Sequence, residues 1–103
     1  MTASLKSSTA VKIINDINAY MKQGTASNAS WYVGITGDIE QRLFGYHKVN
    51  RNGRWIWCQA TNHHEARAIE MAYHDAGCKG SHGGGDHTAI YIYAYLIAHY
   101  TKE

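Results

Sequence analysis

The chain lacks several features that would place it in a specialised class of protein. It has no proline, which is unusual for 103 residues, and it shows neither an internal repeat nor a linker segment. No run of about 18 apolar residues occurs, so we expect no membrane-spanning helix. The N-terminus lacks a basic region followed by an apolar stretch, so we expect no signal peptide. This length predicts one domain over residues 1–103, with a loose end at 1–8.

Cysteine and charge are also scarce. Cys58 and Cys78 are too few and too far apart for a disulfide framework, so we expect free thiols in a reducing cytoplasm. Charged residues make up 17% of the chain and hydrophobic residues 45%, which is too apolar for a disordered protein. The formal net charge of +2 permits a nucleic-acid partner but gives little support for one. The sequence leaves homo-oligomerisation open.

Tyrosine is abundant, whereas phenylalanine is nearly absent. Eight tyrosines and three tryptophans accompany a single phenylalanine. A tyrosine combines an apolar ring with a polar hydroxyl group, so it suits semi-exposed clefts as well as small cores. Composition alone does not separate these two uses.

Hydrophobic periodicity and capping signals predict three helices. Asp38 is a natural N-cap for a short helix over residues 39–47. A capping-box pattern opens a further helix within residues 62–77, which a glycine closes. The first helix, over residues 9–24, has an apolar stripe at three- and four-residue steps: Val11, Ile14, Ile17 and Met21.

Segments rich in aromatic and β-branched residues predict three strands between these helices. On the last strand Tyr91, Tyr93 and Tyr95 share one face. Trp55 and Trp57 share a face of the second strand along the chain. They could pack in the core or stack on nucleic-acid bases. The alternating order favours an α+β fold with a small three-stranded antiparallel or mixed sheet packed by three helices. The strands are expected at residues 31–36, 54–60 and 88–97.

The first strand and the helix after it carry side chains that could do chemistry. Tyr32 and Gly34 lie on the strand, and Arg42 follows Tyr32 by ten positions. Tyr46 lies one helical turn after Arg42, so the two share a helix face. His47 is adjacent to Tyr46. A titratable aromatic side chain and an arginine are thus expected on consecutive elements.

Together with Glu70 in the middle of the third helix, this order resembles the GIY-YIG nuclease superfamily. In that family a Tyr-Ile-Gly strand leads into a helix that bears an arginine, followed one turn later by a histidine or tyrosine. A later helix carries a glutamate that binds a divalent metal. Here Tyr32-Val33-Gly34 stands for the Tyr-Ile-Gly triplet, and the match covers residues 31–77.

The sequence departs from the family before Tyr32. A Gly-Ile-Tyr strand should precede the Tyr-Ile-Gly strand, but the residues around Tyr20 have the pattern of a helix. The last strand supplies tyrosines from the other end of the chain. We therefore expect a permuted arrangement, in which this strand pairs beside residues 31–36 and contributes Tyr91 or Tyr93.

The resemblance implies a metal-dependent endonuclease that hydrolyses phosphodiester bonds in DNA or RNA. Glu70 would bind one divalent ion, Mg²⁺ or Mn²⁺, with water in the other positions. Arg42 has the planar fork that matches phosphate oxygens. Side chains that would take or pass on the proton of the attacking water are expected among Tyr32, Tyr46, His47, Tyr91 and Tyr93.

The glycine-rich segment over residues 77–87 offers two further sites. Its backbone amides could form an anion nest, so Gly83 and Gly84 join Gly34 and Arg42 as expected substrate-binding positions. The simpler explanation of the same glycines is a flexible connection that needs positive φ. A zinc site is a second possibility, with ligands among Cys58, His74, Cys78, His82 and His87. The spacing of these residues fits no standard zinc finger.

Each candidate residue also has an ordinary structural explanation. Tyr32 could pack on the sheet, Arg42 could be a solvated helix residue, and Glu70 could pair with Arg67 or His74. A second hypothesis is therefore a catalytically inactive module of the same fold, which binds a nucleotide, a nucleic acid or a protein. A third is a protein–protein element, for example in phage–host conflict.

Overall fold

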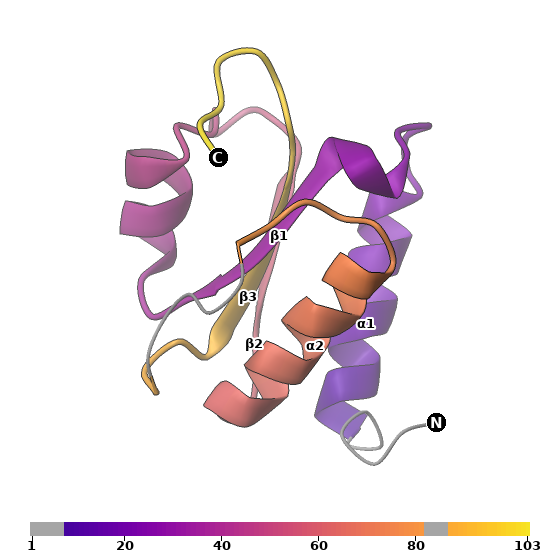
Figure 1. Cartoon of the computed structure of the whole chain (residues 1–103), viewed down its shortest axis with the longest axis vertical. Helices are drawn as coiled ribbons and strands as arrows, with labels where there is room; N and C mark the ends of the chain where they lie inside the picture. The colour runs from indigo at the N-terminus through magenta and orange to yellow at the C-terminus, as the bar shows by residue number, and fades with distance from the viewer. Residues whose placement is uncertain (1–7, 82–86) are drawn as a thin grey trace.

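A three-stranded antiparallel sheet separates the helices into two layers (Figure 1). The computed structural model describes residues 8–81 and 87–103. β3 (Tyr91–Leu96) lies at the centre of the sheet, between β1 (Trp31–Thr36) and β2 (Trp55–Gln59). Both strand pairs are antiparallel, which confirms the predicted α+β fold and excludes the mixed sheet. The last strand also pairs beside β1, as we expected for a permuted arrangement.

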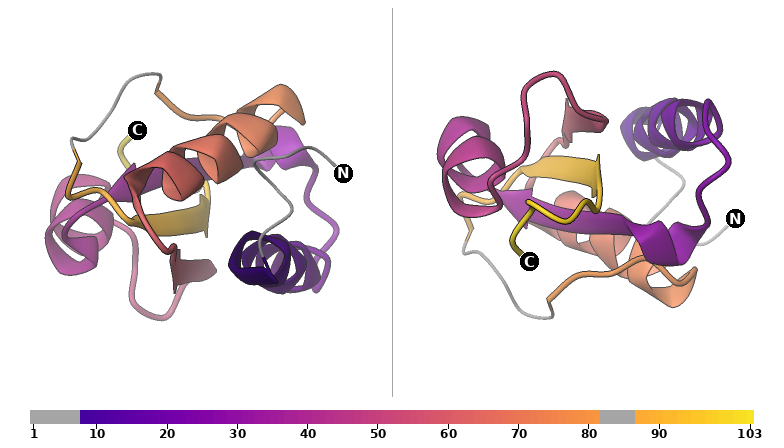
Figure 2. Two further views of the ribbon diagram at one scale, coloured as in Figure 1. Left: turned by 90° about the horizontal axis from the view of Figure 1, so that it is seen from below. Right: turned by 90° about the horizontal axis from the view of Figure 1, so that it is seen from above.

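Helices cover both faces of the sheet. α1 (Ser8–Met21) and α2 (His63–Asp75) pack on one face, and η3 (Glu40–Tyr46) lies on the other (Figure 2). A short 3-10 turn, η2 (Asn28–Ser30), leads into β1. None of the helices in the described part of the chain is long and apolar enough to cross a membrane.

The face under α1 and α2 holds the larger apolar core. Alternate residues of β1 and β3, among them Trp31, Val33 and Ile92, pack there against both helices. The predicted stripe on α1 was only partly right, because Val11 and Ile14 are half-buried. The side chains of α1 that are buried are Ala10, Ile13, Ile17 and Met21.

The opposite face of the sheet carries the tyrosines. Tyr32 of β1 lies opposite Tyr95 of β3, and Gly34 lies opposite Tyr93. These tyrosines form a second, smaller cluster with Leu43 of η3. The alternation of the last strand was therefore read correctly, and η3 is the element that covers it.

Local signals account for most helix ends. The Asp38 side chain accepts a hydrogen bond from the Gln41 amide at 3.1 Å, ahead of η3. The Asn62 side chain accepts one from the Glu65 amide at 2.9 Å, and Gly77 closes α2 with φ of +107°.

The bounds of α1 differ from the prediction at both ends. The helix begins at Ser8, which we had placed in the loose end, and it ends at Met21 rather than Gly24. The rest of the expected loose end, residues 1–7, lies outside the described residues.

The short helix η3 has π rather than α geometry. The His47 amide donates to the Arg42 carbonyl, five residues earlier, at 2.9 Å. Such wide turns are rare and occur frequently at functional sites. The turn keeps Tyr46 near Arg42 and also brings His47 round toward the sheet, where its side chain is buried.

The segment after α2 runs beside the outer edge of β1. The Lys79 amide donates to the Trp31 carbonyl at 2.8 Å, and the Val33 amide donates to the Lys79 carbonyl at 2.9 Å. A Cβ atom at Gly80 would lie 2.7 Å from the Val33 carbonyl oxygen, so this close approach requires glycine. The segment thereby carries Ser81 to the tyrosine face.

Candidate functional site

A small pocket opens at the β1 edge, where the two layers of the fold meet. Its volume is about 40 Å³. Since one water molecule needs roughly 10–15 Å³ of such space, the pocket has room for a cation or a few waters. It is lined by Tyr32, Gly34, Ile35, Arg42, Glu70, Ser81 and Tyr93. Five of the predicted site residues, from four elements, are therefore gathered at one point.

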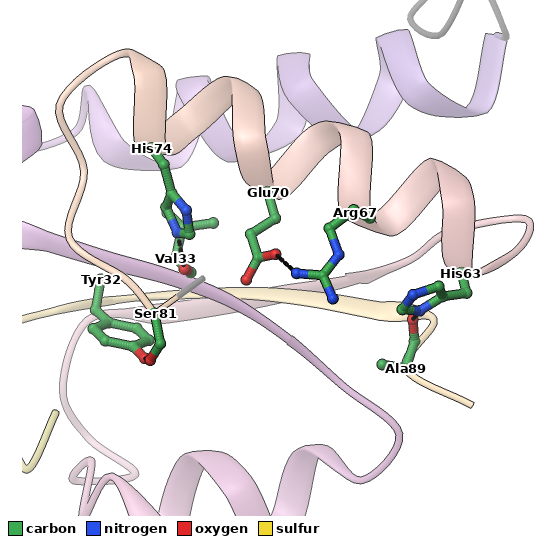
Figure 3. A network of polar contacts seen from close by, with 8 residues as sticks. All are labelled: Tyr32, Val33, His63, Arg67, Glu70, His74, Ser81 and Ala89. Carbon is green, nitrogen blue, oxygen red and sulfur yellow. Dashed lines mark hydrogen bonds and ion pairs between the residues drawn. The ribbon is translucent and has the colours of Figure 1, made fainter. Parts of the chain in front are cut away.

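Glu70 reaches this pocket from the side of α2. Its side chain is buried, with 3% of the residue exposed, and Figure 3 shows it extending from the helix toward the sheet. Arg67 Nη1 donates to Glu70 Oε1 at 3.1 Å, so the ion pair that we considered as an alternative role is present. A carboxylate has several acceptor positions, so an ion pair with arginine does not by itself exclude a metal-binding role.

Arg42 reaches the pocket from η3, on the opposite face of the sheet. Its Nε is buried and finds no hydrogen-bond partner among the described residues. The guanidinium lies over the Tyr46 ring, 5.1 Å from the centroid. Leaving a buried donor unpaired costs about 1–3 kcal/mol, so an arginine held this way suits an anionic ligand that would satisfy it.

Tyr93 and His47 form a buried hydrogen-bonded pair behind the pocket. Tyr93 Oη lies 2.7 Å from His47 Nε2, and only 1% of His47 is exposed. Burial lowers the pKa of His47 below its usual range, with the nearby Arg42 acting in the same direction. Burial also raises the pKa of Tyr93 above its usual value. Both groups are therefore neutral at neutral pH.

Tyr32 completes the wall of the pocket. Its hydroxyl group is hydrogen-bonded to Ser81 Oγ at 2.9 Å (Figure 3). Its ring stacks on Tyr95, with centroids 5.2 Å apart, and lies 4.6 Å from the ring of His47. The tyrosine of the Tyr-Val-Gly triplet thus packs in the sheet and presents a hydroxyl group to the pocket at the same time.

Gly34 is needed because of Tyr93. A Cβ atom at position 34 would lie 2.5 Å from Tyr93 Oη, a distance that no side chain can keep. β1 therefore has a glycine at the position where the Tyr93 hydroxyl group of β3 lies against it. We had expected Gly34 to bind substrate; its observed contact is with Tyr93.

Several predicted residues lie elsewhere. Tyr46 is 41% exposed, beside Arg42 and beneath the Lys102 ammonium, which lies 5.2 Å from its ring centroid. Tyr91 packs against Trp57, with ring centroids 5.6 Å apart, and is not among the described residues that line the pocket. Gly83 and Gly84 lie outside the described residues.

The expected free thiols are present, but the alternative zinc site gains no support. Cys58 and Cys78 are both free. His74 Nε2 lies 2.9 Å from the Val33 carbonyl oxygen, and His82 lies outside the described residues. Within residues 8–81 and 87–103, no three His, Cys, Asp or Glu side chains are grouped as metal ligands would be.

Sequence reasoning missed three contributors to the site. Tyr95, whose hydroxyl lies 3.2 Å from His47 Nδ1, could have been found, because it shares the face of Tyr93. Ser81 and Lys102 carry no such signal. Ser81 reaches the site because the segment after α2 runs beside β1, and Lys102 acts through its backbone carbonyl.

Comparisons of the chain with protein-family models, curated proteins and solved structures found no match.

Proposed function

We propose that the chain is a metal-dependent endonuclease with a GIY-YIG-like site, which hydrolyses phosphodiester bonds in DNA or RNA. The observation that carries this proposal is the meeting of Arg42 and Glu70 in one pocket from opposite layers of the fold. Phosphodiester hydrolysis needs a cation to neutralise the phosphate and a carboxylate to hold a hard metal ion. The free thiols of Cys58 and Cys78 suit the reducing cytoplasm in which we expect the protein to act.

The pocket offers oxygen donors that fit a single hard divalent ion. Glu70 is the only carboxylate among the described residues that line it, and the hydroxyl groups of Tyr32 and Ser81 lie on its wall. Mg²⁺ typically keeps several waters and takes one or two carboxylates. Glu70 would therefore hold Mg²⁺ or Mn²⁺, and the bound ion would polarise the phosphate and stabilise charge on the leaving oxygen.

The remaining side chains would bind and orient the reactants. Arg42 would grip the phosphate, because its planar fork matches two phosphate oxygens and its Nε has no partner among the described residues. Tyr93 is better placed than Tyr32 to take a proton from the attacking water, since its hydroxyl group lies against the nitrogen of His47. Tyr32, fixed by Ser81, would orient that water.

An exposed tryptophan lies beside Tyr93 on the same face of the sheet. Trp57 is opposite Tyr93 in the β2–β3 pair and is 45% exposed, because η3 covers Trp55 and leaves Trp57 open. Unpaired bases stack readily on such indole rings. We propose that Trp57 supports the base of a nucleotide whose phosphate lies at Arg42.

A cleavage assay with matched variants tests the function. The purified protein is incubated with single-stranded and double-stranded DNA and RNA in Mg²⁺, in Mn²⁺ and in a chelator. We expect metal-dependent cleavage that is lost in Glu70→Gln and kept in Glu40→Gln, whose side chain is 65% exposed. Cleavage at the wild-type rate in Glu70→Gln, or no cleavage with either metal, would overturn the proposal.

A second candidate is an inactive module that binds nucleic acid through the same pocket. Glu70 is the only carboxylate among the described residues that line the pocket, and the net charge is +2. Both features are compatible with binding alone, which needs no catalytic step. Fluorescence anisotropy with labelled oligonucleotides separates the two candidates. Binding that Arg42→Gln abolishes, without cleavage under any metal condition, would support the module and exclude the nuclease.

A further inference from the structure

His47 and Lys102 are joined at two points. The Lys102 carbonyl oxygen lies 2.7 Å from His47 Nδ1, and the Lys102 amide donates to the His47 carbonyl at 2.7 Å. A closed turn holds the tail in this position, since the Thr101 hydroxyl group donates to the Ala98 carbonyl at 2.8 Å and accepts from the Ala98 amide at 3.0 Å. Lys102 is therefore hydrogen-bonded directly to the buried histidine through both its amide and its carbonyl group.

This contact determines which nitrogen of the imidazole carries hydrogen. A carbonyl oxygen can only accept, so Nδ1 is the donor to Lys102. The Tyr95 hydroxyl group, 3.2 Å from Nδ1, donates to the same carbonyl oxygen at 3.4 Å and so does not compete for the role of donor to Nδ1. In a neutral imidazole Nε2 then has a lone pair, and Tyr93 must donate its hydroxyl hydrogen to it. Lys48, which follows the histidine, has φ of +60°, an uncommon conformation for a residue other than glycine.

We propose that the Lys102 carbonyl fixes His47 as the Nδ1–H tautomer, and that His47 Nε2 serves as the acceptor in a proton relay through Tyr93. This role rests on the proposed function. As the water oxygen bonds to phosphorus, its proton passes to Tyr93 Oη while the Tyr93 hydroxyl proton passes to His47 Nε2. The bond from phosphorus to the leaving oxygen breaks, and that oxygen takes a proton from solvent. The imidazolium then returns its extra proton to solvent through Tyr93.

The surroundings of His47 suit an acceptor that is charged only briefly. The rings of Tyr32, Tyr93 and Tyr95 pack around it, and Tyr46 meets its edge. The Lys102 carbonyl and the Glu103 carboxylate favour the imidazolium, whereas burial and Arg42 oppose it. Burial is the largest of these effects, so the histidine rests neutral with Nε2 free to accept.

Nitrogen NMR on the full chain, without metal or substrate, tests the tautomer. We expect the ¹⁵N signals of His47, assigned by their loss in His47→Gln, to show hydrogen on Nδ1. Lys102→Ala should keep this pattern, because it leaves the backbone carbonyl in place. A chain ending at Thr101, and Thr101→Val, which opens the turn, should both yield a mixture of tautomers. Hydrogen on Nε2 in the wild type, or an unchanged tautomer in both altered chains, would overturn the proposal.

Kinetics test the relay itself. The chain ending at Thr101 should lose about 10²-fold in kcat with KM nearly unchanged, which is the scale of one proton-transfer group. An unchanged kcat in a chain that has lost the tautomer would overturn the relay. An Nδ1–H tautomer in a protein that cleaves no nucleic acid would instead count against the proposed function, and the role of the Lys102 carbonyl in fixing the tautomer would stand.

Discussion

Gly34 and Tyr93 face each other across the β1–β3 pair, and the tyrosine hydroxyl group occupies the space that a side chain at position 34 would need. We therefore expect Gly34→Ala to push the Tyr93 hydroxyl away from His47 Nε2. Overpacking of this kind costs about 1–3 kcal/mol in the free energy of unfolding. Chemical denaturation measures this loss, and the cleavage assay should show reduced kcat.

Gly45→Ala is the matched control for this substitution. Gly45 lies on η3, and the nearest atom that an added Cβ would meet is Gln41 Cγ at 4.0 Å. The alanine should be neutral or slightly stabilising, because a helical glycine costs about 0.5–1 kcal/mol relative to alanine. Equal stability of Gly34→Ala and wild type would contradict the contact between Gly34 and Tyr93.

Arg42→Lys should separate stability from activity. The substitution keeps the positive charge but removes the planar fork, including the buried Nε that has no partner among the described residues. We expect an unchanged or slightly higher free energy of unfolding, with kcat/KM lower by about 10²-fold, as for loss of one charge-stabilising donor. Thermal melting and steady-state kinetics give the two numbers. A large loss of stability would instead mark Arg42 as a structural residue.

Glu70→Gln should abolish metal binding while keeping the contact with Arg67. The amide has the same shape, and its oxygen can still accept from Arg67 Nη1. Titration calorimetry with Mn²⁺ should show one site in the wild type and none in the variant, with Glu40→Gln binding like the wild type. Mn²⁺ bound equally by Glu70→Gln would place the metal site elsewhere.

The sequence predicted the fold better than the site. β1 was found at its observed bounds, and the alternation of the last strand placed its tyrosines on one face, because both signals are local. Period-two alternation could not choose between Tyr91 and Tyr93, since both lie on that face and only the strand register brings Tyr93 to Gly34. The phase of α1 was misjudged because Ala10, a fully buried residue, contributes little to a hydrophobic pattern.

Two features of the site have no signature in the sequence. In an α-helix, Arg42 and Tyr46 share a face. The π turn of η3 also brings the His47 amide to the Arg42 carbonyl and places the His47 ring in the core. One hydrogen-bond partner of that ring is the backbone carbonyl of Lys102, and every residue has such a group. Backbone geometry and tertiary contacts, rather than residue type, determine both.

Protonation of His47 should destabilise the protein below neutral pH. Burial, assisted by Arg42, lowers its pKa in the folded state, so the unfolded chain binds the proton more readily. The contribution of neutral His47 to the free energy of unfolding is therefore fully present above about pH 6.5, the usual pKa of histidine. It decreases as the pH falls toward the folded-state pKa, by at most about 1.4 kcal/mol per pH unit. Denaturation curves between about pH 5 and 8 measure this change. His47→Gln should give a flatter profile, and identical slopes would contradict a buried neutral histidine.

Trp57 should matter for unpaired nucleic acid and little for the fold. It is 45% exposed beside Tyr93, and stacking of a base on an aromatic ring contributes about 1–3 kcal/mol. Trp57→Ala should therefore weaken binding of a single-stranded oligonucleotide by about 5- to 150-fold, with a smaller effect on a duplex whose bases are already stacked. Met71→Ala is the matched control, because Met71 is 52% exposed on α2, in the layer opposite to η3. Fluorescence anisotropy gives the affinities of the wild type and both variants for each oligonucleotide, and equal losses for the two variants would show that the indole ring makes no specific contact with a base.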